Sequence, residues 1–433
     1  MLRSRLRGKH ALPLVGAIAA ALAMTGCGTN QGATPDDSAT TAAAGAKFQV
    51  DTSKCEDAAA ATKVVTGTWK VGYSLPLSGP VAGVVGYSME GWKARIEAEN
   101  AAGGINGVKI EVSYLDDAYT PDKAKANATQ FLQSTKVDSL ITFGSGPVGA
   151  IADDQNAACV PLLYPSSSVQ QYRDIKEYPW TVQFLPAGDA EARYDVSLIK
   201  QKFPNGAKVG IAENQTASGK GYSAAFQAAA KAAGGVDIVV IAPSTDPNAA
   251  ATQLKAANVD VVYDAGITTD CGPVVQALAR VGFPPKLVVN PSNCADANAY
   301  IAAGDAADGN VIPAWAKNPA DPALANDEGV KQYLAKVTTP NKNNTIAVAG
   351  WIQADLLINT LKQAAASPGG LTHVSVIQAA RDQLYASPMF INGVKWESSP
   401  TSLVGMNAFQ TTAWSAAEKA FKAQGALIPV GAN

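Results

Sequence analysis

The stretch AKVGIAENQTASGKGYSAAFQAAAKAAGGVDIVVIAP, residues 207–243, decides the fold class of this chain. It begins with a short apolar strand (207–213), continues through a polar loop into an alanine-rich helix that ends at two glycines, and finishes with a second apolar strand (236–243). Strands that are apolar on successive residues are typical of sheets covered on both faces. A strand, a helix and a strand in this order predict two parallel neighbours joined by a crossover helix.

The same alternation of strands and helices extends in both directions. Toward the N-terminus it runs from WKVGYSLPL (69–77) to VPLLYP (160–165), and toward the C-terminus it reaches KLVVNP (286–291). The rhythm breaks at 180–192, and a second crossing is expected near 309–318. Two such series predict an α/β fold of two doubly wound parallel-sheet lobes, with a ligand cleft between them.

The expected organisation follows from these breaks. The first lobe is predicted to comprise 64–184 plus about 314–390, and the second lobe 185–313 plus about 391–433.

The N-terminal residues have the composition of an export signal. Four basic residues precede a short apolar run, and MTGCGTNQGATPDD (24–37) then turns polar after one cysteine. This pattern resembles a bacterial lipoprotein signal of residues 1–26, cleaved before Cys27. Lipidated Cys27 would anchor the chain to the outer face of the cytoplasmic membrane, with 27–63 as a flexible tether. The alternative is an ordinary signal peptide in which this cysteine occurs by chance.

Charge argues against one class of partner. The chain has 34 Lys and Arg against 36 Asp and Glu, a net charge of −2, and loss of the four basic leader residues would lower it to −6. Nucleic-acid-binding proteins need a basic face, so no nucleic-acid partner is expected.

Four cysteines remain after the leader: Cys55, Cys159, Cys271 and Cys294. Outside the cytoplasm an even number favours disulfides, and four cysteines allow three connectivities. We favour Cys271–Cys294, since each follows one of two successive predicted strands, which leaves Cys55–Cys159.

Histidine is nearly absent, because only His10 in the leader and His373 occur. This count excludes metal sites built on several histidines and weakens the interpretation of the chain as an envelope hydrolase. We expect neither a catalytic residue, a metal nor a cofactor.

Ligands of open α/β sheets bind beyond the carboxyl ends of the strands, so the loops there carry the candidate residues. Ser145 stands at a helix start after a strand, and Ser166, Ser167 and Ser168 follow the next strand. Helix starts with free N–H groups favour a carboxylate, although such serines are also common as helix caps. Further candidates are Asp264, with Asp246 as its rival, for a ligand ammonium group, and Tyr222 and Trp315 for an apolar wall.

Several stretches together resemble the branched-chain amino-acid (Leu/Ile/Val) binding proteins, which are type I periplasmic binding proteins of ABC importers. These stretches are VGYSLPLSGPVAG, NAAGGINGVKIEV, DDAYTPDKA and NQTASGKGYSAAFQAAAKAAGG, in family order, and the resemblance covers about 67–425. It implies two lobes joined by three crossovers, a ligand in the cleft, and lobe closure that the membrane permease detects.

The resemblance also implies site residues. Ser145, with Gly146 beside it, matches the loop that binds the ligand carboxylate, and Ser168 matches a family threonine. The chain departs from the family at Ser218, where a tyrosine is common, and near Asp246, where the family glutamate that pairs with the ammonium group has no clear match.

We therefore expect a lipid-anchored, monomeric solute-binding protein that delivers a small polar solute, a branched-chain or other amino acid in first place, to an ABC permease. Two alternatives stay open. The chain is a ligand sensor for a signalling receptor, or it binds an amide, a short peptide or an aromatic acid.

Overall fold

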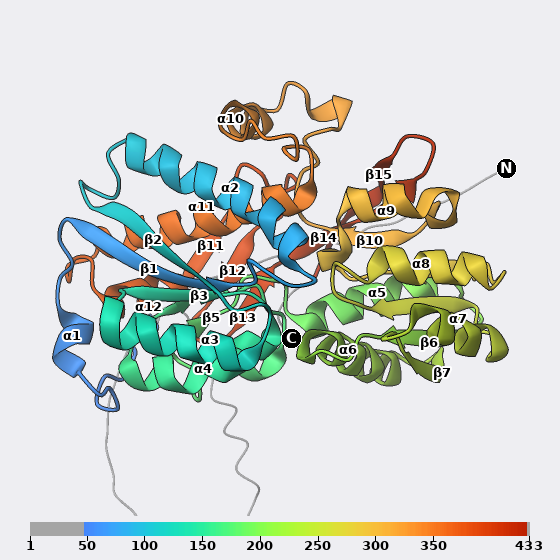
Figure 1. The fold of residues 1–433 in the computed structure, drawn as a ribbon, viewed down its shortest axis with the longest axis horizontal. Helices are drawn as coiled ribbons and strands as arrows, with labels where there is room; N and C mark the ends of the chain where they lie inside the picture. The colour runs from blue at the N-terminus through green and yellow to red at the C-terminus, as the bar shows by residue number, and fades with distance from the viewer. Residues whose placement is uncertain (1–46, 431–433) are drawn as a thin grey trace, which may run out of the picture. The chain divides into compact units, whose positions relative to one another are not determined.

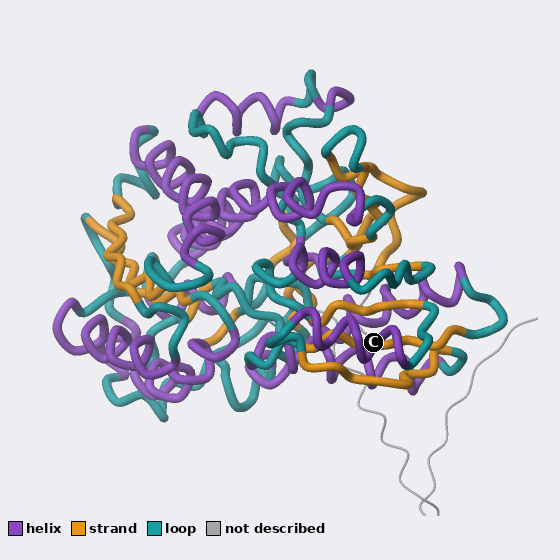
Figure 2. The backbone as a smooth tube through the Cα atoms, turned by 45° about the vertical axis from the view of Figure 1, so that its right-hand side comes forward, coloured by secondary structure: helices purple, strands orange, loops and turns teal. Residues whose placement is uncertain are grey.

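A computed structural model describes residues 47–430. The predicted leader, Cys27 and the first part of the tether lie outside this range. Figure 2 shows the helices and strands of the described part, with the strands gathered in separate groups.

The first lobe is built on a parallel sheet of five strands in the order β2-β1-β3-β4-β5. Before each strand that follows β1 in the chain, a helix or loop returns the chain to the edge of the sheet where the strands begin, as the sequence predicts (Figure 1). The strands are β1 (Thr68–Leu75), β2 (Lys109–Asp116), β3 (Ser139–Thr142), β4 (Leu162–Leu163) and β5 (Thr181–Val182).

Helices cover both faces of the first sheet. One core packs the sheet against α2, α11 and α12, and a separate core packs it against α3 and α4. The helices are α2 (Ala82–Ala101), α3 (Pro121–Thr129), α4 (Ser145–Ala158), α11 (Thr345–Ala365) and α12 (His373–Ala380). The first core is large enough to bury Trp69, Trp92 and Trp396 completely.

Helices α2 and α11 touch backbone to backbone. A Cβ on Gly91 of α2 would lie 1.9 Å from the carbonyl oxygen of Ala347, and one on Gly350 of α11 would lie 1.8 Å from that of Ser88. Only glycine fits at either position, since real Cβ atoms do not approach other atoms so closely.

The second lobe contains a seven-stranded sheet in the order β15-β14-β10-β9-β8-β6-β7. Strands β6 to β10 are parallel, and β14 and β15 are antiparallel additions at one edge. The strands are β6 (Ala207–Glu213), β7 (Val236–Pro243), β8 (Val261–Ala265), β9 (Leu287–Val289), β10 (Val311–Ala314), β14 (Ala408–Ser415) and β15 (Ala420–Pro429). The bounds of β6 and β7 are those predicted from the sequence, and the two strands pair in parallel.

Two groups of helices cover this second sheet. Helices α5 and α6 pack on one face, and α7, α8 and α9 pack on the other. These helices are α5 (Gly188–Lys202), α6 (Ala217–Ala233), α7 (Pro247–Ala256), α8 (Cys271–Arg280) and α9 (Ala297–Ala303).

The chain passes between the sheets after β5, after β10 and before β14. The second passage carries α10 (Glu328–Lys336), and a small antiparallel sheet precedes the third. Its strands are β11 (Gln383–Tyr385), β12 (Trp396–Ser398) and β13 (Leu403–Met406). Within 47–430, no helix combines the length and the apolar character that a bilayer crossing requires.

The last part of the predicted tether packs on the first lobe instead. Phe48 is buried, and the Arg381 guanidinium lies 5.4 Å from its ring centre. The short helix α1 (Ala58–Thr62) follows Cys55, which forms a disulfide with Cys159 at the end of α4. One apolar side chain and one covalent bond thus hold a segment that composition alone assigns to a flexible linker.

Candidate functional site

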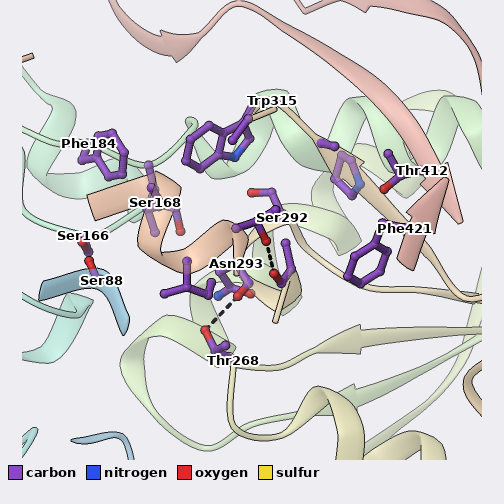
Figure 3. A pocket seen from close by; sticks show the side chains of 18 of the residues that line it. Ser88, Ser166, Ser168, Phe184, Thr268, Ser292, Asn293, Trp315, Thr412 and Phe421 are labelled. Carbon is purple, nitrogen blue, oxygen red and sulfur yellow. Dashed lines mark hydrogen bonds between the residues drawn. The ribbon is translucent and has the colours of Figure 1, made fainter. Parts of the chain in front are cut away.

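A cavity of about 460 Å³ lies at the carboxyl ends of the parallel strands. Its wall comes from loops of both lobes and from the segments that pass between them, and Figure 3 shows it from close by. Many of the wall residues have polar side chains and follow strands or begin helices. They include Ser145, Ser166, Ser167, Ser168, Ser218, Thr268, Ser292 and Asn293.

The first end of the cavity, which we call the serine end, is formed by Ser145, Ser167, Ser168 and Ser218. The hydroxyl oxygens of Ser145 and Ser167 are 3.0 Å apart, and the Ser218 hydroxyl donates to that of Ser145 over 3.1 Å. Three hydroxyl groups from three separate loops thus meet where α4 begins. The Ser145 backbone N–H already donates to the Ser218 hydroxyl at 3.3 Å, and Pro147 has no N–H. The hydroxyl groups, with the Gly146 N–H in the first turn of α4, are therefore the donors that this end of the cavity offers to a carboxylate.

Local sequence explains why Ser145 lies there. Helix α4 begins at Ser145 itself, so this serine does not occupy the cap position that the sequence analysis allowed it. Gly144 occupies the cap with a φ of 95°, and a Cβ at this position would lie 2.4 Å from the Tyr119 ring. Glycine therefore lets the strand β3 turn sharply into the helix beside an aromatic ring.

Tyr119 joins the two lobes at the serine end. It follows β2 with a φ of 62°, and its hydroxyl lies 3.3 Å from that of Ser218 at the start of α6. The buried Asp117 carboxylate accepts from the Tyr119 backbone N–H at 2.8 Å and from the Ser74 hydroxyl at 2.8 Å, which fixes the loop. Burial raises the pKa of the Tyr119 hydroxyl, so it stays protonated and can donate.

Six of the nine predicted ligand residues line the cavity: Ser145, Ser166, Ser167, Ser168, Ser218 and Tyr222. Gly146 is the second residue of α4 and does not belong to the wall. Trp315, predicted as part of an apolar wall, does line the cavity.

Neither predicted aspartate lines the cavity. Asp246 is exposed and caps α7 by accepting from the backbone N–H groups of Asn248 and Ala249. Asp264 is fully buried in β8, and neither of its carboxylate oxygens has a hydrogen-bond partner among the described residues. Burial raises the pKa of Asp264 well above its usual range, and it does not line the cavity.

The middle of the cavity is made by two loops of the second lobe. The Thr268 hydroxyl donates to the Asn293 carbonyl at 2.7 Å, and the Asn293 amide nitrogen donates to the Gly266 carbonyl at 3.4 Å. The predicted disulfide Cys271–Cys294 is present and joins the same two loops. Asp264 lies close to both sulfurs, but bonded cysteines offer no thiolate to a metal ion.

Two buried polar atoms in the cavity wall have no partner among the described residues. These are the Tyr222 hydroxyl and the side-chain carbonyl oxygen of Asn293. Unpaired buried polar atoms cost free energy, so a ligand that pairs with them gains affinity.

The cavity wall also includes Tyr119, Phe184, Thr268, Ser292 and Asn293, none of which was predicted as a ligand residue. The rule that ligands bind beyond strand ends points to all five, because they lie in the loops after β2, β5, β8 and β9.

Besides Asp321, which lines the cavity, a second carboxylate lies close to its middle. Asp270 accepts from the Ile267 backbone N–H at 3.4 Å and from the Asn214 amide, and its charge helps to raise the pKa of Tyr119. Asp270 therefore contacts one wall residue, Ile267, through a hydrogen bond, and its charge acts on a second wall residue, Tyr119.

Comparisons with known proteins agree with this geometry. A family model described as "Periplasmic binding protein" matches residues 68–425. The chain is 25% identical over 242 residues to an "Amino acid binding protein" of Pseudomonas aeruginosa, which covers 53% of this chain and 63% of the relative. It is 25% identical over 317 residues to "Leu/Ile/Val-binding protein homolog 1" of Brucella abortus, which covers 72% of this chain and 82% of the relative.

Solved structures show the same fold. A branched-chain amino-acid ABC transporter protein from Thermus thermophilus, crystallised with valine, superposes with a TM-score of 0.74 at 14% identity, over 84% of this chain and 97% of that one. The leucine-binding protein LivK of Thermotoga maritima gives a TM-score of 0.68 at 15% identity, over 83% and 99%. Since the family model spans most of the chain and the described residues form its two-lobed fold, this chain belongs to the periplasmic binding protein family, whose members are extracytoplasmic solute-binding proteins.

Proposed function

We propose that this chain is the solute-binding component of an ABC importer, and that it binds an amino acid through the ligand carboxylate at the serine end. The observation that carries the proposal is the meeting of the Ser145, Ser167 and Ser218 hydroxyls at the start of α4. The names of the relatives, which include amino-acid and Leu/Ile/Val-binding proteins, support the same ligand class.

The ammonium group of the amino acid would face the second lobe. The unpaired Asn293 carbonyl oxygen is free to accept a hydrogen bond there, and the Asp270 carboxyl group lies nearby, where it accepts from Asn214 and Ile267. This takes the place of the pairing that the sequence analysis assigned to Asp264 or Asp246.

Binding would favour closure of the lobes. Ser145 and Ser168 come from the first lobe, whereas Ser218 and Asn293 come from the second, so one ligand contacts both. A ligand that binds the closed arrangement more tightly than the open one shifts the population toward closure, which a permease can then detect.

We propose no catalysis. The only histidine in the described part, His373, lies with Nδ1 3.2 Å from the Cys159 carbonyl and Nε2 3.5 Å from Asp138, and it does not line the cavity. Within residues 47–430, the serines of the cavity therefore have no imidazole base beside them.

The proposal includes export and a lipid anchor on Cys27 at the outer face of the cytoplasmic membrane. This part rests on the sequence pattern of residues 1–27.

Calorimetry with paired probes tests the binding function. We expect L-leucine to bind the wild-type chain, and Ser145→Ala and Ser168→Ala to weaken it about tenfold each, the cost of one lost hydrogen bond to a charged group. Asp270→Asn should weaken L-leucine but not 4-methylpentanoate, which has the same carboxylate and side chain without the ammonium group. Failure of every amino acid to bind would refute the proposed function, and equal loss of both probes in Asp270→Asn would refute the role of Asp270.

A further inference from the structure

The cavity does not end at the serine end. It continues past Trp315 to strands β14 and β15, where Thr412, Phe421, Ala423 and Leu427 complete its wall. We call Trp315 and these four residues the hairpin compartment. In Figure 3 Trp315 lies between Phe184 on one side and Thr412 and Phe421 on the other.

The volume of the cavity exceeds what a branched-chain amino acid needs. A cavity of about 150 Å³ in a protein core holds one benzene molecule. The cavity here, at about 460 Å³, is about three times as large. A carboxylate held at the serine end with a four-carbon side chain would leave the hairpin compartment unfilled, so a larger body fits better.

The walls of the hairpin compartment are aromatic and held in place. Trp315 packs edge to face on Phe184 with ring centres 5.7 Å apart. Phe421 packs on Tyr300 and on Trp414, each with ring centres 4.9 Å apart. Aromatic walls in these arrangements bind a ring or an extended chain without first reorganising.

Trp315 also offers a hydrogen-bond donor. Its side chain is 6% exposed and lines the cavity, and its indole N–H has no acceptor among the described residues and is not a buried atom, so it is accessible from the cavity. An indole N–H needs a hydrogen-bond partner once a ligand covers it. An acceptor on the ligand body would supply it.

The described wall carries one cation and one carboxylate, Lys317 and Asp321. Lys317 is the one cation of the described wall, and its ammonium group already lies 2.7 Å from Asp327 and 2.8 Å from the Pro388 carbonyl. The five residues of the hairpin compartment are uncharged, so they suit an apolar ligand body and offer no partner to a second charge.

We propose that the hairpin compartment is a second subsite, which binds an aromatic or long aliphatic body of the same ligand whose carboxylate lies at the serine end. The ligand class is then a carboxylate, most simply an aromatic amino acid or an aryl-substituted acid, with an acceptor that pairs with Trp315. This inference rests on the proposed function, because the proposed function places the ligand carboxylate at the serine end.

A filling variant tests the subsite. Ala423 and Gln424 are neighbouring exposed residues of β15, but only Ala423 lines the cavity. Because successive residues of a strand point to opposite faces, Ala423→Phe fills the hairpin compartment and Gln424→Phe is its matched control. The probes are L-valine, L-tryptophan and 3-phenylpropanoate, measured by calorimetry.

In the wild type we expect L-tryptophan or 3-phenylpropanoate to bind at least tenfold more tightly than L-valine. Ala423→Phe should remove this advantage and leave L-valine within twofold, and Gln424→Phe should change neither. Trp315→Phe, which removes the indole N–H and keeps a ring, provides a second measurement if Ala423→Phe fails to fold.

The measurements distinguish failure of the second subsite from failure of the proposed function. Tight binding of L-valine with weaker binding of both larger probes, or equal loss of all probes in Ala423→Phe, overturns the subsite and leaves the proposed function intact. Failure of all three probes and of L-leucine overturns the proposed function.

Discussion

Removal of the Cys271–Cys294 disulfide should weaken ligand binding by more than removal of the other disulfide does. The bond joins the loop of Thr268 to the loop of Asn293, and both residues line the cavity. Without it, one hydrogen bond between Thr268 and Asn293 and one from the Asn293 amide remain to hold the two loops together. We expect Cys271→Ser/Cys294→Ser to lose about tenfold in affinity for the best amino-acid probe.

The cost in stability follows from the length of chain that each bond closes. Cys271 and Cys294 are 23 positions apart, and Cys55 and Cys159 are 104 apart. The chain-entropy estimate gives a loss of about 3.4 kcal/mol for the first bond and about 4.7 kcal/mol for the second. The second bond thus costs more in stability although it lies away from the cavity wall.

This contrast makes Cys55→Ser/Cys159→Ser the matched control. Urea unfolding measures the free energy of each double variant, and calorimetry measures its affinity at a temperature where both stay folded. The expected result is a larger loss of stability in the control and a larger loss of affinity in Cys271→Ser/Cys294→Ser. Equal affinities in the two variants, or a loss of affinity that follows stability alone, would refute the claim that this bond positions the ligand loops.

Three further predictions concern packing, pH and anchoring. Gly350→Ala should destabilise the chain by about 1–3 kcal/mol or more, because the new methyl group would overlap the Ser88 carbonyl. Thermal unfolding measures this loss of stability. An unchanged Tm would contradict the close approach of α2 and α11. Burial raises the pKa of Glu191 to about 7 and that of Asp195 in the same direction, so the folded state binds more protons than the unfolded one. The free energy of unfolding should therefore fall as pH rises from about 4.5 to about 7, and Glu191→Gln should flatten this slope; a rise over the same range contradicts it. Cys27→Ser should move the exported chain from the membrane fraction to the soluble fraction, and unchanged fractionation would contradict the lipid anchor.

The sequence predicts most of the fold because its strands and helices have strong local patterns. Strands β6 and β7 are mainly apolar runs that each follow a glycine, and both have the predicted bounds. The end of the chain is different. The segment AEKAFKAQGALIP contains residues with good helix propensity, yet most of it forms β15. Pairing with β14 overrides that propensity, and pairing partners are not visible in a local pattern.

The sequence predicts which loops line the cavity, but not which way individual side chains point. Ser145, Ser168 and Ser218 line the cavity because they follow strands or begin helices at the correct edge. Asp264 does not line the cavity, and its strand could not show this, because β8 is buried on both faces and its sequence does not show which way each side chain points. The contact of Tyr119 with Ser218 spans 99 positions and depends on how the two lobes meet.

The bond between Cys55 and Cys159 has a mechanical consequence. A force applied to the chain from the N-terminal side of Cys55 passes through the sulfur atoms into the end of α4, instead of loading the noncovalent contacts of α1 and the backbone hydrogen bond from Val65 to Leu371. Those contacts can be peeled apart one by one, whereas a covalent bond bears the load at a single point. If the chain is tied to a membrane through Cys27, drag on the bound lobes is therefore carried by the helix whose opposite end begins at Ser145.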